Sequence, residues 1–259
     1  MKHLIADFTV LVSKNTYHKY NIIAEDFVCS DARQTDLFLQ VDEADIIYEI
    51  QYSERKFNGP NGILHASAIQ RKLSERLPLN ASFLLHSACF DVDGEGVAFC
   101  ALSGTGKTTQ MLNWQELLGD KMTVVNGDKP IVRFFDKDFC EKNNLDIPDG
   151  TKLGVPYAYG TPWNGKEGLG TNMRTELKHI CFIERSETNF VTKPTKSEAV
   201  GRIMKQVYMP KDPVALANTL HLVDRLIDSC ELWIIHCNME PESAKVAYDA
   251  IFEGGTLHR

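Results

Sequence analysis

The sequence lacks the features of membrane-bound, secreted and nucleic-acid-binding proteins. No apolar run approaches the about 20 residues of a membrane-spanning helix, and the start of the chain has no long apolar segment typical of a secretory signal. The formal net charge of −7 disfavours a nucleic-acid partner, because affinity for nucleic acid comes mainly from basic residues that neutralise phosphates. We therefore expect a cytoplasmic protein with no membrane and no nucleic acid among its partners.

Closely spaced cysteines are also absent. The seven cysteines are odd in number and none forms a Cys-x-x-Cys pair, so we expect buried free thiols and no zinc site. Internal repeats and low-complexity linkers are missing too. With 259 residues and 43% hydrophobic composition, the chain is long enough for one substantial core, or for one domain with a small appendage.

The first 78 residues are expected to form a small β-rich N-terminal part that ends in a helix. Three stretches are rich in β-branched and aromatic residues and are separated by polar turns, which predicts strands at 4–13, 36–41 and 46–52. Apolar residues then recur at helical spacing from Ile63 to Leu77, and Pro78 closes this predicted helix.

The remainder, residues 79–259, is expected to form an α/β domain. A β-hairpin from Phe83 leads into a glycine-rich loop, and mostly strand and loop are expected between Asp136 and Thr175. The C-terminal third should be mainly helical, with Asp212-Pro213 as a cap and first-turn proline and Gly254-Gly255 as a stop. The expected helices are 107–118, 197–208, one opening at 213, and 241–252; the expected strands include 123–126, 177–184 and 231–237.

The stretch FCALSGTGKTTQM has the pattern of a phosphate-binding loop. In the usual GxxxxGK[ST] pattern, Ala101 stands for the first glycine, and Gly106, Lys107 and Thr108 are all present between a predicted strand and a predicted helix. Lys107 is expected to reach the β- and γ-phosphates and Thr108 to ligate Mg²⁺, while the helix start favours an anion. The expected nucleotide-binding residues are Ser103, Gly104, Thr105, Gly106, Lys107, Thr108 and Thr109.

A second metal anchor is expected where the next strand ends. Asp128 follows the predicted strand 123–126, so we expect it to bind the metal directly or through water. The alternative is an ordinary turn aspartate, since Asn-Gly-Asp is a good turn sequence by itself.

The upstream hairpin adds a histidine to this site. If the tight turn is centred on Gly94-Glu95, Asp93 faces Gly96 and His86 lies opposite about Ser103. A histidine there could donate to the γ-phosphoryl group or tune the base beside it. The alternative is a strand histidine satisfied by a neighbour.

A long polar loop, 160–174, could close over the nucleotide. Trp163 could stack on a base, and Lys166 or Arg174 could neutralise charge on the transferred phosphoryl group. The alternative is an ordinary surface loop with solvated charges.

These motifs together resemble one superfamily. LSGTGKTT is similar to the nucleotide loop of ATP-dependent phosphoenolpyruvate carboxykinase, and the layout from Phe83 to Val132 resembles HPr kinase/phosphorylase and its shorter relatives, which include peptide-modifying kinases. The resemblance implies a P-loop-containing mixed β-sheet and the same nucleotide and metal roles for Lys107 and Thr108. HPr kinase relatives form hexamers, so the resemblance also implies that this protein could form a homo-oligomer.

The resemblance further implies a metal-binding role for Asp128 and makes His86 the active-site histidine. The family has two adjacent aspartates where this sequence has Gly127-Asp128, and in HPr kinase the first is assigned as the base that takes the serine proton. Its absence argues against protein-serine phosphorylation or moves the base role to Asp128 or His86.

Three functions remain open from the sequence. The first is an ATP- and Mg²⁺-dependent kinase whose acceptor is a serine of a small protein or peptide, or a small metabolite. The second is an ATP-binding regulatory module with weakened chemistry, and the third is a nucleotide hydrolase. Neither an NKxD guanine-reading motif nor an LSGGQ-like motif occurs in the sequence, which argues against GTPases and ABC-type ATPases.

Overall fold

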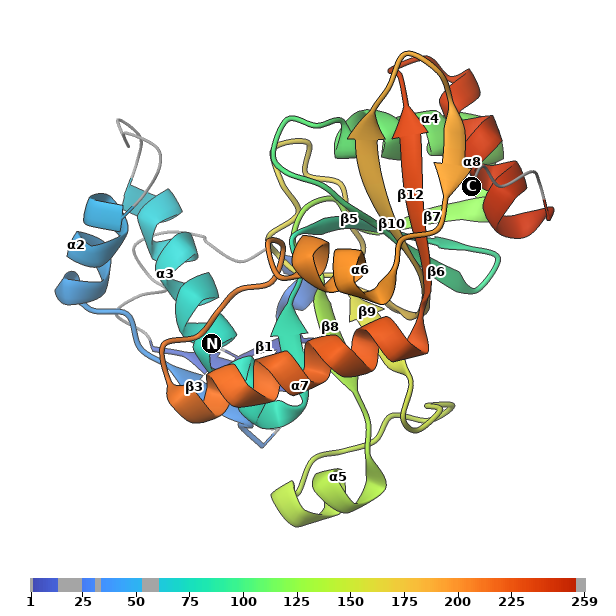
Figure 1. Ribbon diagram of the computed structural model, residues 1–259. Coiled ribbons are helices and arrows are strands. Elements are labelled where there is room, and N and C mark those ends of the chain that lie inside the picture. The colour runs from blue at the N-terminus through green and yellow to red at the C-terminus, as the bar shows by residue number, and fades with distance from the viewer. Residues whose placement is uncertain (1, 14–24, 31–33, 53–60, 255–259) are drawn as a thin grey trace.

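The computed structural model describes residues 2–13, 25–30, 34–52 and 61–254. Within these ranges the chain forms a mixed α/β fold with a three-stranded and a nine-stranded sheet (Figure 1). None of the helices in these ranges is long and apolar enough to span a bilayer.

The N-terminal part forms the smaller sheet and two helices. The predicted strand 4–13 is in fact a hairpin, because Ala6 and Asp7 have positive φ angles of 52° and 61° and form the tight turn between two strands. The third strand runs parallel to the second. The elements are β1 (Lys2–Ile5), β2 (Phe8–Val12), a short 3₁₀ turn (Glu25–Phe27), β3 (Leu37–Leu39), α2 (Glu43–Tyr52) and α3 (Asn61–Arg76), followed by a 3₁₀ turn (Leu77–Asn80).

The predicted strand at 46–52 is wrong, because these residues belong to helix α2. The helix begins with a reciprocal cap in which Asp45 N donates to Asp42 Oδ1 and Asp42 N donates to Asp45 Oδ2. Arg71 of α3 then binds Asp45 and Glu49, which lie one helical turn apart. The capping and the ion pairs outweigh the β propensity of the isoleucines and tyrosines. The helix predicted at 63–77 is confirmed as α3.

The larger sheet mixes parallel and antiparallel pairs around one long strand, β10. The first residues of β10 pair antiparallel with β9, whereas its later residues lie parallel to both β6 and β12. The strands are β4 (Ser82–Leu84), β5 (Ser87–Val92), β6 (Glu95–Cys100), β7 (Met122–Asn126), β8 (Ile131–Phe134), β9 (Pro156–Tyr159), β10 (Arg174–Arg185), β11 (Phe190–Thr192) and β12 (Glu231–Cys237), in the order β4-β8-β9-β10-β6-β5-β7 with β12 beside β10 and β11 beside β12.

Helices cover both faces of this sheet (Figure 1). Side chains alternate along β10, so Ile180 and Phe182 pack with α6 and α7, whereas Cys181 and Ile183 pack in the cluster that contains α4 and α8. The predicted helices at 107–118, from 213 and at 241–252 are confirmed. The helices are α4 (Lys107–Leu118), α5 (Lys137–Asn143), α6 (Lys196–Ile203), α7 (Pro213–Ser229) and α8 (Glu242–Phe252).

The end of α6 and three short elements of this part differ from expectation. Helix α6 ends at Ile203 rather than Tyr208, because Val207 forms a bridge with Leu85 and the main chain is drawn into that pairing. Helix α5 and strands β8 and β11 were not predicted. Gly254 has a positive φ after α8, and its predicted companion Gly255 lies outside the described residues.

The two parts share one apolar cluster. Phe8 and Val10 of the small sheet are buried together with Ile131 and Tyr157 of the large sheet. Arg133 of β8 is almost fully buried, donates to Ala6 O at 2.7 Å, and holds its guanidinium 3.8 Å from the Phe8 ring centre. The domain boundary expected at residue 78 stays a prediction. Among the described residues, one buried apolar cluster contains side chains from both sides of this position.

Candidate phosphate-binding site

The glycine-rich loop lies between β6 and α4, as a phosphate-binding loop requires. Gly104 and Gly106 have φ angles of 78° and 127°, which disfavour any side chain with a Cβ, so glycine is needed at both positions. Helix α4 begins at Lys107 and presents its free N–H groups at the loop. Ala101, in place of the usual first glycine, is buried in the core.

Lys107 folds back across this loop. Its Nζ donates to Ala101 O at 2.7 Å and lies 3.3 Å from His86 Nε2, and the residue is only 9% exposed. Burial lowers the pKa of the Lys107 ammonium, while the negative charge of Asp128 works against that shift. The Lys107 ammonium therefore lies inside the site with no carboxylate within ion-pair distance among the described residues. It is available to pair with the phosphates of a bound nucleotide.

Asp128 is placed by a turn that Asn126 stabilises. Asn126 Oδ1 accepts hydrogen bonds from Asp128 N at 2.9 Å and Lys129 N at 2.6 Å, and its Nδ2 donates to Thr161 O at 3.1 Å. Sequence reasoning missed this role, although an asparagine at a strand end before Gly-Asp was the available signal. Asn126 fixes where the carboxylate points.

His86 and Asp128 form the second side of the site. His86 Nε2 lies 3.2 Å from Asp128 Oδ1, and Lys129 Nζ lies 3.9 Å from Asp128 Oδ2. Burial acts to raise the pKa of Asp128, but the hydrogen bond from His86 and the charges of Lys129 and Lys107 prevail and lower it. Asp128 is thus an ionised carboxylate at neutral pH, which is the form that binds a metal ion.

The hairpin that carries His86 has a different register from the expected one. The turn is centred on Asp93-Gly94, with positive φ at both residues, rather than on Gly94-Glu95. Ser87 pairs with Cys100, which sets His86 level with Ala101 instead of Ser103. A one-residue shift of the turn moves each cross-strand partner by two residues, so the side chain keeps its face. His86 therefore still points at the phosphate loop.

Gln206, which sequence reasoning also missed, selects the tautomer of His86. With its amide assigned so that the nitrogen faces the neighbouring acceptors, this nitrogen lies 3.1 Å from Ala101 O, 3.2 Å from His86 Nδ1 and 3.2 Å from His86 O, and its two hydrogens are directed at this group of acceptors. A donor on Nδ1 leaves the proton of the neutral ring on Nε2, from which it is donated to Asp128. No local sequence signal links Gln206 to His86, because the contact joins distant segments.

One cavity of about 780 Å³ gathers most of the expected site residues. A bound anion there would meet loop N–H groups, the Lys107 ammonium and the His86 N–H, and the hydroxyl of Thr108 and the carboxylate of Asp128 supply hard oxygen ligands of the kind that Mg²⁺ prefers. These residues fit a magnesium–nucleotide complex. The cavity is lined by Ile63, Ser67, His86, Ser103, Gly104, Gly106, Lys107, Thr108, Thr109, Gly127, Asp128, Lys129, Gly165, Lys166, Glu167 and Met239.

The loop at 160–174 contributes only in part. Lys166 is exposed at the edge of the cavity. Trp163 does not line it: its Nε1 donates to Ala66 O at 3.2 Å and its ring packs against the core. Arg174 points elsewhere too, since it donates to Tyr159 Oη and lies 3.7 Å from Asp7. Neither side chain is positioned for its expected role, which was stacking on a base for Trp163 and neutralising phosphoryl charge for Arg174.

The backbone of the same loop explains the glycine at position 127. A Cβ on Gly127 would lie 2.9 Å from Asn164 O and 3.1 Å from Leu169 O, and Gly127 N donates to Leu169 O. The loop therefore occupies the space in which a side chain at 127 would stand. An aspartate cannot be added at this position unless the loop moves.

Among known proteins, the sequence has distant similarity to solved structures. No protein-family model and no curated protein matches the sequence. A solved structure of the HPr(Ser) kinase/phosphatase from Coxiella burnetii is similar at 11% sequence identity with a TM-score of 0.26, over 55% of this chain and 90% of that one.

Proposed function

We propose that this protein is an ATP- and Mg²⁺-dependent kinase of the HPr kinase type that transfers the γ-phosphate to a hydroxyl group. The observation that carries the proposal is the convergence of Lys107, His86 and Asp128, from three separate segments, at the mouth of the phosphate loop. A glycine loop alone would fit any phosphate binder, whereas an ionised carboxylate beside a lysine and a histidine N–H also fits phosphoryl transfer.

Each residue has a distinct role in this proposal. Loop N–H groups and Lys107 hold the phosphates, and the Nε2–H of His86 would be shared between Asp128 and the charge that develops on the transferred group. Thr108 and Asp128 would hold Mg²⁺, which supplies neutralisation of the phosphate charge. Lys166, at the rim, is free to approach the nucleotide.

The reaction balances with the groups present. The acceptor oxygen forms a bond to the γ-phosphorus, the bond to the β–γ bridging oxygen breaks, and ADP leaves with the electron pair. The hydroxyl proton passes to the Asp128 carboxylate, the one proton acceptor among the three groups, since Nε2 of His86 already carries a proton. A carboxylate is sufficient because the transition state of phosphoryl transfer is loose and little nucleophile activation is needed.

A second candidate function is an ATP-binding regulatory module. The crowding at Gly127 favours it, because the position of the first family aspartate is closed to any side chain. In this case the protein binds ATP and Mg²⁺ but turns over slowly or not at all.

One set of measurements separates these functions. ATP·Mg²⁺ binding is followed by isothermal titration calorimetry, and ADP release is followed with and without small hydroxyl compounds or serine peptides. Acceptor-dependent ADP release supports the kinase. Binding without turnover supports the module, and acceptor-independent release indicates a hydrolase. Absence of ATP binding contradicts the proposal as a whole.

A further inference from the structure

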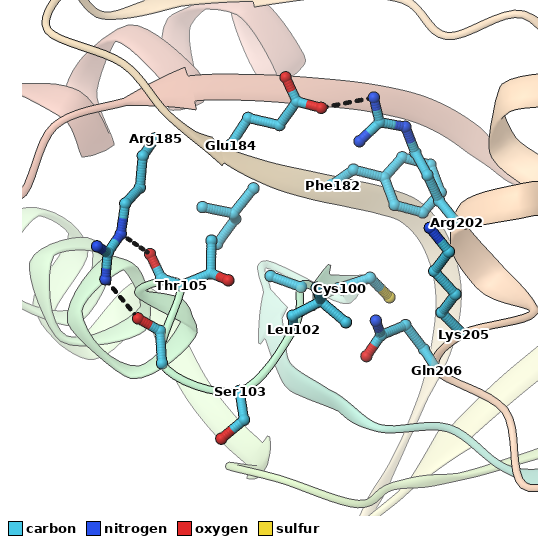
Figure 2. A pocket seen from close by; sticks show the side chains of 13 residues that line it. Cys100, Leu102, Ser103, Thr105, Phe182, Glu184, Arg185, Arg202, Lys205 and Gln206 are labelled. Carbon is cyan, nitrogen blue, oxygen red and sulfur yellow. Dashed lines mark hydrogen bonds and ion pairs between the residues drawn. The ribbon is translucent and has the colours of Figure 1, made fainter.

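A second cavity adjoins the phosphate site (Figure 2). It measures about 670 Å³, a size typical of small-molecule sites. Ser103 and Gly104 line both cavities, so the loop between them is shared. The cavity is lined by Cys100, Ala101, Leu102, Ser103, Gly104, Thr105, Phe182, Ile183, Glu184, Arg185, Arg202, Lys205 and Gln206.

The charged side chains around this second cavity are mostly basic. Arg185 lies on the side of the phosphate loop, and Arg202 and Lys205 lie on the side of α6 (Figure 2). Glu184 is the one acid of the lining, so three positive and one negative side chains leave a net charge of +2. The whole chain carries −7, which makes this a local reversal of sign. Such a concentration of positive charge favours an anionic ligand.

The three cations differ in how they are engaged. Arg185 donates to Gly104 O at 2.5 Å and Thr105 O at 3.3 Å, so it braces the phosphate loop. Arg202 Nη2 lies 2.6 Å from Glu184 Oε1, which leaves its other N–H groups for a ligand. Exposed Lys205 has no ion pair within the described part of the chain. Arg202 and Lys205 are therefore the two groups able to hold an anion.

This cavity is connected to the phosphate site through shared residues and through Gln206. Gln206 is part of its lining and donates to His86, which lines the phosphate cavity. Ser103 and Gly104 therefore lie between this cavity and the one that His86 and Asp128 line. Burial raises the pKa of the Cys100 thiol to about 12, so the thiol stays neutral and does not act as a nucleophile towards a ligand held in the cavity.

We propose, on the basis of the proposed kinase function, that this second cavity binds the phosphoryl acceptor through an anionic group on it. The acceptor is then a small hydroxyl compound that also carries a carboxylate or a phosphate. Arg202 grips the anionic group through paired N–H donors, Lys205 adds a mobile charge, and the hydroxyl end extends past Ser103 and Gly104. An uncharged adenine base would gain little from these cations.

A matched set of probes tests this assignment. Glycerol, glycerate and glycerol 3-phosphate share a three-carbon hydroxyl skeleton and differ in whether they carry no anion, a carboxylate or a phosphate. Each is titrated into the full-length ¹⁵N-labelled protein with ADP and Mg²⁺ present, and binding is followed by chemical-shift changes. We expect one or both anions to bind and glycerol not to bind, and the tighter anion identifies which group the acceptor carries.

Variants show whether the binding is at this cavity. Arg202→Ala and Lys205→Ala should each weaken anion binding about tenfold or more, in line with the loss of a charged hydrogen bond. Glu184→Gln releases Arg202 from its ion pair and should tighten binding. Lys245→Ala, which removes one charge from an exposed ion pair on α8, should have no effect.

Three outcomes overturn the inference. They are equal binding of glycerol and the anions, no binding of any probe, and anion affinity that does not change in Arg202→Ala and Lys205→Ala. Loss of ADP affinity in these two variants would show instead that the cavity holds the nucleotide. ADP and ATP binding by the wild-type protein is measured separately, so failure of the kinase proposal is distinguishable from failure of this one.

Discussion

His86 Nδ1 lies 3.2 Å from the side-chain nitrogen of Gln206, and this contact decides which ring nitrogen of the histidine carries the proton. With Nδ1 accepting, Nε2 donates to Asp128 Oδ1 at 3.2 Å. A chain of hydrogen bonds thus runs from the turn after α6 to the carboxylate of the phosphate site. Gln206 acts through His86, so it is a positioning residue.

Reversing the polarity at Gln206 should therefore change which ring nitrogens carry protons. In Gln206→Glu the new carboxylate accepts from Nδ1–H while Asp128 still accepts from Nε2–H, so both ring nitrogens are protonated. We expect ¹⁵N NMR of the imidazole to report the Nε2–H form in the wild type and the doubly protonated ring in the variant, with altered turnover. Gln115→Glu, at an exposed position of α4, is the control. The same tautomer in both proteins would show that Gln206 has no such role.

Removal of the imidazole should affect turnover more than nucleotide binding. His86→Ala deletes one donor directed at the transferred group, a loss that typically lowers kcat by about 10²–10³-fold. Affinity for ATP should stay near that of the wild type, because Lys107 and the loop N–H groups remain. Steady-state kinetics and calorimetry measure the two effects. Wild-type turnover in His86→Ala would make the histidine purely structural.

Lys107→Ala should remove most of the affinity for ATP. The loss of a charged donor to the phosphates is expected to weaken binding about 10–100-fold. The fold should persist, because the Lys107 side chain ends at the cavity, where its ammonium contacts Ala101 O and His86 Nε2. Calorimetry and circular dichroism are compared with Lys121→Ala, an exposed lysine beyond the end of α4. Unchanged ATP binding by Lys107→Ala would contradict the central assignment.

The site was more predictable than the small sheet, because a phosphate loop is a local feature. Its glycines, Lys107 and Thr108 lie in one short stretch, and the pattern itself predicts a strand before the loop and a helix after it. Asp128 could be found because it closely follows the end of the next strand. The register of the hairpin failed by one residue at the turn, since Asp93-Gly94 satisfies the turn geometry better than the pair that was expected.

The rest depended on contacts between distant segments. Helix α2 has the composition of a strand, and ion pairs with α3 decide its conformation. The placement of Trp163 against Ala66 and the pairing of Gln206 with His86 each join residues that no local pattern connects. The reason for Gly127 is also tertiary, because backbone oxygens of another loop fill its side-chain space.

Adding an aspartate at position 127 should therefore not raise turnover. Even Gly127→Ala brings a Cβ into contact with two backbone oxygens, and overpacking of this kind typically costs about 1–3 kcal/mol. We expect both Gly127→Ala and Gly127→Asp to lower the Tm and the ATP affinity. Gly201→Ala, in α6 with open space around it, should be neutral or stabilising. If Gly127→Asp has the wild-type Tm, the loop that contains Asn164 and Leu169 can move aside without cost, which contradicts this prediction.

The two parts of the chain should unfold together. Phe8→Ala removes a fully buried ring that packs beside Arg133, and such substitutions cost about 3–5 kcal/mol. Urea unfolding followed by circular dichroism and by tryptophan fluorescence should give coincident transitions, both shifted to lower urea. Phe38→Ala, at a half-exposed position in the same small sheet, should shift them little. Two separate transitions would mean that the N-terminal part unfolds on its own.

Acid should destabilise the fold through a histidine in the same small sheet. His3 of β1 is fully buried, and burial lowers its pKa from the usual 6.5 to about 4. Between these two pH values the unfolded chain binds a proton at His3 and the folded chain does not. The free energy of unfolding therefore keeps the full contribution of His3 above pH 6.5 and loses it as the pH falls towards 4, by up to about 3 kcal/mol.

Urea unfolding between pH 8 and pH 4 measures this dependence. His3→Gln should flatten the fall of unfolding free energy between about pH 6.5 and pH 4, because the variant has no group there that takes up a proton on unfolding. His221→Gln removes an exposed histidine of α7 and should leave the slope as in the wild type. If His3→Gln keeps the wild-type slope, the acid sensitivity arises elsewhere, and His3 is not held neutral by its burial in the small sheet.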